Sequence, residues 1–437
     1  MDAAELDRQT RTYAGCIPPH LVARLLELGH GDVVEFWAGQ GEWFCAQAWA
    51  RRLSDQGRRA EATAVLAPYV ATGWWTAVRF AAVLLEEWGR SDGAITTIRN
   101  HSKTGGRLMA DHLGRLLARH GRGDEAFELL SPHIRDWLLA AALVEVAKAS
   151  GREEEAAALL ANRIEAASGC ETPACSRHGV EPSNAIGLLA GIRERQGRID
   201  EAIALLRTRS STSVNNRDQL ADLLARHGLV EQLRAYAAVE YHGHAAQRLA
   251  ELLEDAGDLD AAIAVYRQPG ESRARQVRGA VHLADLLSRH GRGGEAITVM
   301  RTLADSRGGA QDWIVDTLCT LYIDHDRVAD GLAYLDALAP SSGEEWEFFR
   351  IRLRLLVAYG RRDEAIELAT ARLEEDTWCA AAAIGEMLAE AGRTEEAVDV
   401  LARHASGNSS VLAWHLIDLG RIQDAVAVVR ERKLLAR

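Results

Sequence analysis

Two cysteines and a histidine lie within nine residues of one another, at Cys170, Cys175 and His178. Thiolate and imidazole groups are ligands that zinc prefers, so these residues are weak candidates for a zinc site. A structural zinc site needs four ligands, and no fourth is evident nearby. A reversible disulfide between Cys170 and Cys175, or two unpaired thiols in a surface loop, accounts for the same residues. We therefore expect no bound cofactor.

Basic residues also recur in front of glycine, in the triplets Arg119-His120-Gly121, Arg226-His227-Gly228 and Arg289-His290-Gly291. A histidine beside an arginine suggests acid–base chemistry. Each triplet falls where a helix is expected to end, however, and helix ends carry carbonyl groups without a partner. The sequence therefore favours capping of the last carbonyls by these side chains over catalysis.

Tryptophan forms a third pattern, recurring fourteen residues before a glycine at Trp43, Trp75, Trp137, Trp346 and Trp378. Such a column could stack against a ligand, but its helical phase predicts packing between neighbouring elements. Among the tryptophans outside the column, three are candidates for an exposed binding residue: Trp37, Trp74 and Trp414. Four further cysteines are expected to pack as small apolar residues: Cys16, Cys45, Cys319 and Cys379.

Two motifs of common enzyme classes are missing from the sequence. It contains no phosphate-cradling Gly-x4-Gly-Lys-Ser/Thr and no His-Glu-x-x-His. The formal net charge is -12, from 51 Lys+Arg against 63 Asp+Glu, which argues against a protein that coats nucleic acid or anionic lipid. We expect a binding protein and not an enzyme.

The elements that must position these residues follow from a repeat. A glycine, or once an aspartate, recurs twelve times, and the eleven intervals average 33 residues: Gly57, Gly89, Gly121, Gly151, Gly197, Gly228, Gly257, Gly291, Asp326, Gly360, Gly392 and Gly420. Gly29 adds a plausible N-terminal copy. We call these residues the turn positions. Periods of this length indicate a stacked array of similar units.

Fixed columns around each turn position predict two helices per repeat. Large apolar residues stand eight and four before it and a small residue stands seven before it, which places all three on one face of a first helix, helix A. Glycine then ends helix A, because it adopts a left-handed conformation without strain. An acidic residue four after the turn, an alanine five after it and an apolar residue nine after it indicate a second helix, helix B.

These columns resemble those of the tetratricopeptide repeat family, whose period is 34. The resemblance covers about residues 20–435, although alanine mostly replaces the family's aromatic residue eleven before the glycine, and the closing proline is missing from most copies. It implies an all-α fold: an α-solenoid of about twelve or thirteen antiparallel helix hairpins in a right-handed superhelix. The segments expected are 1–19, a helical arm at 20–165, a cysteine-containing loop at 166–184 and a second, continuous arm at 185–437.

In this family helix A lines the concave groove, so residues six and ten before each turn position should face a partner. The early groove would carry Arg51, Arg79 and Arg115, the middle would carry Asp218, Asp222, Glu251 and Asp285, and Trp414 would lie near the end. Segregated charge of this kind favours an extended peptide of complementary charge. An ordinary solvated surface explains the same residues.

Three functions fit the sequence. The first is an interaction scaffold that binds a peptide or partner protein in the groove. The second is an enzyme or enzyme subunit with its active site in the groove or the inserted loop, and the third is a helical-repeat nucleic-acid binder, against which the net charge argues. No apolar run is long enough to cross a membrane, and the acidic N-terminus lacks the pattern of a secretory signal, so we expect a cytoplasmic protein. Self-association is left open.

Overall fold

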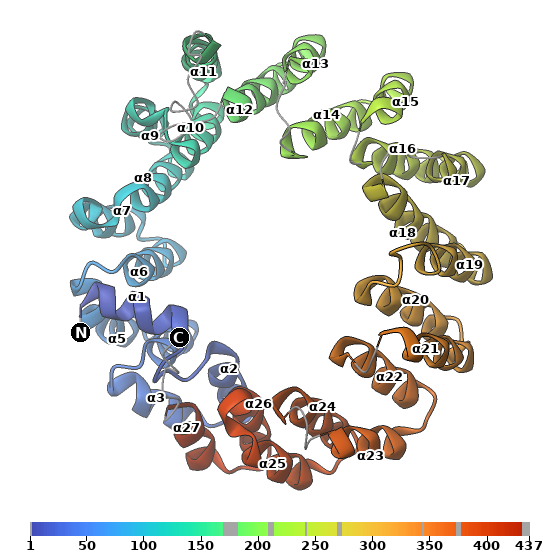
Figure 1. Cartoon of the computed structure of the whole chain (residues 1–437). Helices are drawn as coiled ribbons and strands as arrows, with labels where there is room; N and C mark the ends of the chain where they lie inside the picture. Colours follow the sequence, from blue (N-terminus) through green and yellow to red (C-terminus); the bar gives the residue numbers. More distant parts are fainter. Residues whose placement is uncertain are drawn as a thin grey trace. The chain divides into compact units, whose positions relative to one another are not determined.

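The structure is a computed structural model that describes residues 2–168, 182–208, 214–240, 243–268, 273–342, 345–372 and 377–430. Over these ranges all regular structure is helical, with 27 α-helices, one short 3-10 helix and no strand (Figure 1). The predicted all-α fold is therefore confirmed. No helix within the described ranges has the length and apolar character needed to cross a membrane.

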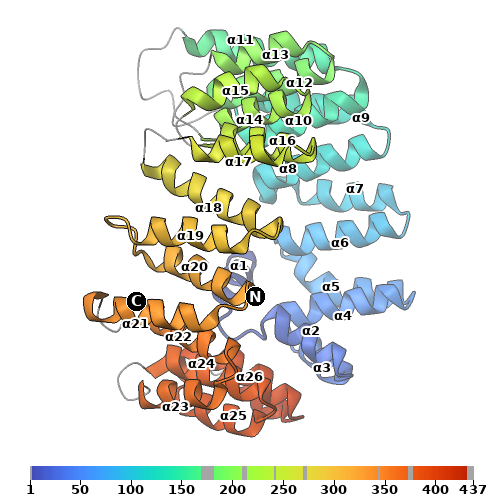
Figure 2. The ribbon, with the colours of Figure 1, turned by 90° about the vertical axis from the view of Figure 1, so that its right-hand side faces the viewer.

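After α1 (Ala3–Thr12), the described helices follow one another in thirteen pairs, as the repeat predicts (Figures 1 and 2). The helices A are α2 (Pro19–Glu27), α4 (Trp43–Asp55), α6 (Trp75–Glu87), α8 (Ser102–Arg119), α10 (Trp137–Ser150), α12 (Pro182–Arg195), α14 (Val214–Arg226), α16 (His244–Asp255), α18 (Arg273–Arg289), α20 (Asp312–Asp324), α22 (Trp346–Ala358), α24 (Thr377–Glu390) and α26 (Ala405–Asp418). The helices B are α3 (Gly31–Gly39), α5 (Arg59–Ala71), α7 (Ser91–Asn100), α9 (Gly123–Leu130), α11 (Glu153–Ser168), α13 (Ile199–Arg207), α15 (Val230–Val239), α17 (Leu259–Arg267), α19 (Gly293–Ala304), α21 (Val328–Ser342), α23 (Arg362–Arg372), α25 (Thr394–Arg403) and α27 (Ile422–Arg430). The 3-10 helix η1 (Ser131–His133) follows α9.

The turn between helix A and helix B has the same geometry in every repeat. All twelve turn positions have positive φ, including Asp326 at 56°, and Gly29 does so as well. The backbone N–H after the turn donates to the carbonyl five residues earlier, as Arg58 does to Leu53 at 2.8 Å and Arg393 does to Leu388 at 2.8 Å. This Schellman arrangement satisfies carbonyls that the helix end would otherwise leave unpaired. The glycine column therefore marks true helix ends.

The small residue of helix A lets helix B approach closely. A Cβ built on Gly114 of α8 would lie 2.6 Å from Leu130 of α9, and one built on Gly385 of α24 would lie 2.9 Å from Leu401 of α25. The neighbouring apolar column is buried, with Leu53 and Leu117 each 1% exposed. Burying such a side chain contributes about 1.5–3 kcal/mol. Each pair thus depends on the apolar face of its neighbours, as expected for a solenoid.

Contacts between the helices divide the chain into two compact units. Unit 1 comprises Met1–Glu153 and Ile366–Arg437, and unit 2 comprises Glu154–Ala365. In unit 1, helix α2 packs against α26 as well as against α4, so the first and last helix pairs are neighbours (Figure 1). These two units do not coincide with the two helical arms expected on either side of residues 166–184. The predicted segment boundaries and the right-handed superhelix stay predictions.

Candidate functional site

The three predicted basic residues lie on consecutive helices A of unit 1. On α4, Arg51 pairs with Glu87 of α6 and lies 5.4 Å from the centre of the Phe80 ring. On α8, Arg115 donates to Asp111 of the same helix at 2.8 Å. Arg79 of α6 is exposed and makes no hydrogen bond or ion pair with the described residues. Of these three arginines, only Arg79 therefore presents a positive charge without a counter-charge among the described residues.

Beside these arginines lies an aromatic pair that the sequence did not reveal. The rings of Trp75 and His112 meet edge to face with centroids 5.6 Å apart, and both side chains are half-buried. Burial lowers the pKa of His112, and the charges of Arg119 and Arg79 lower it further. The His112 imidazole is therefore neutral near pH 7. The helix-A face of unit 1 thus combines the positive charge of Arg79 with the uncharged aromatic rings of Trp75 and His112.

The predicted acidic residues belong to unit 2, where arginines neutralise them. Arg248 donates to Asp222 at 2.5 Å and to Glu251 at 2.8 Å, and Asp285 lies 3.2 Å from Arg289. The side chain of the remaining acid, Asp218, lies outside the described residues. Arg248 escaped the sequence analysis because it stands nine residues before Gly257, outside the two columns assigned to the groove.

Trp414 joins the two ends of unit 1. Its ring stacks on His20 with centroids 6.2 Å apart, and the guanidinium of Arg24 lies 5.2 Å from the ring centre. Arg24 also donates to Asp418 of α26 at 2.7 Å. The half-buried Trp414 thus packs α26 against α2, a contact that accounts for this residue without a ligand.

The tryptophan column is only partly a packing feature. Trp43 is 2% exposed and meets Tyr69 and Trp74 edge to face, as packing requires. In contrast, Trp137 is 55% exposed and Trp378 is 54% exposed, so packing is the wrong interpretation for these two. Both lie at the start of a helix A, where the neighbouring helices leave the ring uncovered.

The Arg-His-Gly triplets were also misread. Their side chains do not reach helix carbonyls but bind a glutamate of the preceding helix A, three residues before its turn position. Glu86 accepts from Arg119 at 2.9 Å and contacts His120 at 3.0 Å, and the same contacts join Glu194 to Arg226 and His227 and Glu254 to Arg289 and His290. We call these three groups the inter-repeat clamps. They are structural links between helix pairs.

Glu42 is a deeply buried acid, 5% exposed, and it has a structural role. Its side chain is the N-cap of α4, where Oε2 accepts from the backbone N–H of Cys45 at 2.6 Å. Burial raises the pKa of Glu42, while hydrogen bonds from Cys45 and neighbouring backbone groups oppose that rise. Glu42 lines neither of the two pockets described below. The raised pKa of Glu42 thus accompanies a helix-capping role and not a position in either of these pockets.

Three of the four cysteines expected to pack as apolar residues do so, whereas Cys379 is half-buried. Cys16 is 5% exposed, while Cys45 and Cys319 are completely buried. Burial raises the pKa of the Cys16 thiol to about 12, so it stays protonated and unreactive. Cys170, Cys175 and His178 lie outside the described residues. Over the ranges that the structure covers, no group of three His, Cys, Asp or Glu residues is arranged to hold a metal ion.

Comparison with solved structures gives many structural likenesses, including the two that follow. No protein-family model and no curated protein matches the sequence. A chain of the Naa15/Naa10 complex bound to HypK-THB is 15% identical, with a TM-score of 0.40, over 95% of this chain and 79% of its own length. A chain of the APC/C hetero-tetramer Cut9-Hcn1 is 12% identical, with a TM-score of 0.25, over 98% of this chain and 97% of its own.

Both TM-scores lie below 0.5, so the fold assignment depends on the helix pairs themselves. Three observations carry it: the paired helices, the left-handed turn positions and the small residues between the two helices of a pair. Together they make this chain a tetratricopeptide-like helical repeat protein.

Proposed function

We propose that the protein is an interaction scaffold whose helix-A face in unit 1 binds a peptide segment or partner protein. The observation that carries the proposal is Arg79, an exposed charge that has no ion pair within the described part of the chain and is flanked on the adjacent helices by Arg51 and Arg115. A stacked array offers such a face over several consecutive helices. Complementary charge would select an acidic segment and orient it along the face.

The alternatives draw less support from the described residues. Glu42 already caps α4, which leaves an enzyme without an assigned acid or base. A nucleic-acid site needs a net basic face, whereas Arg51, Arg115 and Arg248 each pair with an acid. A protein partner tolerates such mixed charge.

Affinity capture from the native cell, followed by binding measurements with the purified partner, tests this function. Arg79→Glu should weaken binding about fivefold or more at low salt, since it replaces an attraction by a repulsion, and added salt should reduce the difference. Arg90→Glu is the matched control, because Arg90 is also exposed and without an ion pair but lies at the start of α7, a helix B. Equal effects of the two substitutions would place the partner elsewhere.

A further inference from the structure

Helix α3 lies between two neighbouring grooves of unit 1, each formed with another helix B. The first, the α3/α5 groove, has a volume of about 740 Å³ and is lined by Ala38, Trp49, Val65, Pro68 and Tyr69 together with Leu6 of α1. The second, the α3/α27 groove, has a volume of about 1130 Å³ and is lined by residues of α3 and α27. The two grooves correspond in the order of the repeats, because α26 packs on α2 as α4 does, but their volumes and linings differ.

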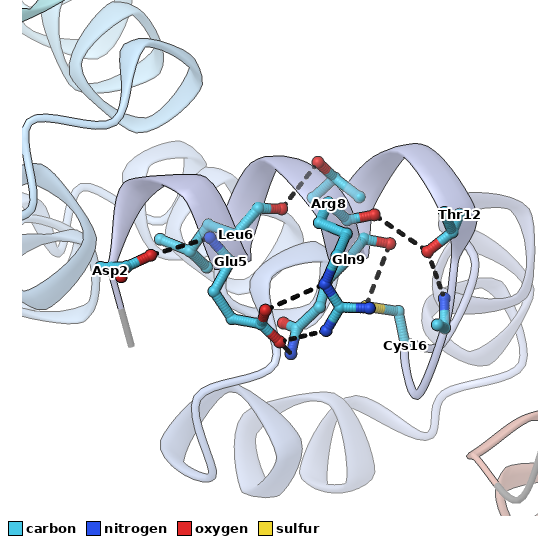
Figure 3. Close-up of polar contacts among 9 residues, drawn as sticks. Asp2, Glu5, Leu6, Arg8, Gln9, Thr12 and Cys16 are labelled. Atoms are coloured by element: carbon cyan, nitrogen blue, oxygen red, sulfur yellow. Dashed lines mark hydrogen bonds and ion pairs between the residues drawn. The ribbon is translucent and has the colours of Figure 1, made fainter. Parts of the chain in front are cut away.

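Helix α1 forms part of the wall of the α3/α5 groove, because Leu6 is one of the lining residues. Leu6 is the buried residue of α1, 1% exposed, and joins the core of unit 1 with Ala3 packed beside it. The rest of the helix is held by local polar contacts: Asp2 accepts from the backbone of Glu5 at 2.8 Å, and Glu5 binds Arg8 at 2.6 Å (Figure 3). A short polar helix can thus pack at this kind of groove through one aliphatic side chain.

The α3/α27 groove presents an apolar surface with no such helix among the described residues. Its lining includes Val33, Phe36 and Trp37 of α3 and Ile422 and Val426 of α27. Phe36 is 57% exposed, a large area for a phenylalanine to leave in water. Burial of the Phe36 ring by an apolar side chain of a partner would therefore be favourable.

Charges at the edge of this groove add specificity. Asp32 is exposed and has no ion pair with the described residues, while Arg430 lies over the Trp37 ring at 3.9 Å. A helix that carried a basic residue near Asp32 and an acidic residue near Arg430 would complement both. Arg421 is less available, because it pairs with Asp424 at 2.9 Å.

We propose that the α3/α27 groove binds a short amphipathic helix of a partner protein, which packs an aliphatic side chain beside Phe36 as Leu6 of α1 packs at the α3/α5 groove. The inference rests on the proposed scaffold function and adds a second surface to it. A partner fits better than a second copy of this chain, because α1, the helix of this type, is already packed against unit 1 with Leu6 buried. The groove would recognise the bound helix through the apolar side chains on one face of that helix, as in other helix-in-groove complexes.

Fluorine NMR on the full chain labelled with 5-fluorotryptophan can test the inference, because Trp37 lines one groove and Trp49 the other. The probe is a synthetic peptide with the sequence of residues 2–13, held helical by a side-chain lactam. Trp37→Phe and Trp49→Phe assign the two resonances. We expect the peptide to shift the Trp37 resonance saturably and to leave the Trp49 resonance unchanged.

Two variants sharpen the experiment. Phe36→Asp should weaken peptide binding at least tenfold, and because Phe36 is exposed the fold should tolerate the change. Tyr359→Asp, which alters another aromatic residue that is 52% exposed, should leave the affinity unchanged. Arg79→Glu should also leave it unchanged, so the groove and the helix-A face are tested separately.

Three results would overturn the inference. A shift of Trp49 alone would mean that the peptide only replaces α1, and no shift at saturating peptide would mean that the groove does not bind such a helix. Self-association of the unlabelled chain that Phe36→Asp abolishes would make a second copy the occupant. If the inference fails while Arg79-dependent partner binding persists, the scaffold function stands without this surface.

Discussion

The inter-repeat clamps should stabilise the contact between successive helix pairs, and Glu86 offers the clearest case. Glu86→Gln keeps the size of the side chain but removes the charge that Arg119 and His120 contact at 2.9 and 3.0 Å. The Glu86 side chain is 23% exposed and that of Arg119 is 49% exposed, so solvent screens much of the attraction. We expect Glu86→Gln to lower the free energy of local unfolding by about 1 kcal/mol, which is more than the loss expected on breaking a fully exposed ion pair.

The same contact predicts a pH dependence. Hydrogen bonds from Arg119 lower the pKa of Glu86 below its usual 4.5, although burial opposes the shift, and His120 lowers it further. The folded state therefore holds the carboxylate charged where the unfolded chain begins to protonate. The stabilisation is fully present above about pH 4.5 and is lost as the pH falls through the lowered pKa.

Native-state hydrogen exchange of the α6 and α8 amides is the suitable assay, because a repeat array need not unfold in a single step. A double-mutant cycle with Glu86→Gln and Arg119→Gln isolates their coupling. Glu61→Gln is the matched control, since Glu61 pairs with Arg58 in an exposed contact within one helix. The reasoning is refuted if Glu86→Gln costs no more than Glu61→Gln, or if the cycle shows no coupling.

Two further predictions follow from unit 1 and from the buried histidines. Arg24→Glu should loosen α26 from α2, because it sets two like charges where Arg24 now binds Asp418 at 2.7 Å. Exchanging both charges, Arg24→Glu with Asp418→Arg, should restore the hydrogen-exchange protection of the α26 amides. If the double variant is no better protected than Arg24→Glu, the pairing is contradicted. Burial lowers the pKa of His112, His282 and His415, so the unfolded chain binds protons more readily below about pH 6.5 and the melting temperature should fall between pH 7 and pH 5. His112→Gln should make that fall smaller, and a melting temperature independent of pH over this interval would contradict the assignment.

Several site predictions failed for one reason: each considered a residue within its own helix. The triplets were assigned to capping because their sequence neighbours are helix ends, whereas their carboxylate partners stand 32 to 36 residues away. Trp414 was assigned to a groove by its position in helix A, whereas its neighbours are His20 and Arg24 at the other end of the chain. Spacing identifies the face of a helix but not what covers that face.

Sequence alone determined the repeat and its helices. Glycine at the turn positions sets the local backbone, and the apolar columns set the buried face, because both depend on residues only a few positions apart. Even Asp326, the one turn position without glycine, takes the left-handed conformation that the period predicts. The count of about twelve or thirteen helix pairs followed from the same signal.

Only the tertiary structure decided which helix faces are buried against other helices and which are exposed to solvent. The contact between Arg24 and Asp418 joins residues 394 positions apart, and no local pattern encodes it. The same packing of α26 on α2 brings α27 beside α3 and creates the groove in which Phe36 is exposed. Contacts between helix pairs act only over short distances in space, but the residues that make them can be far apart in the sequence. Only the folded molecule therefore shows which helix pairs pack against each other.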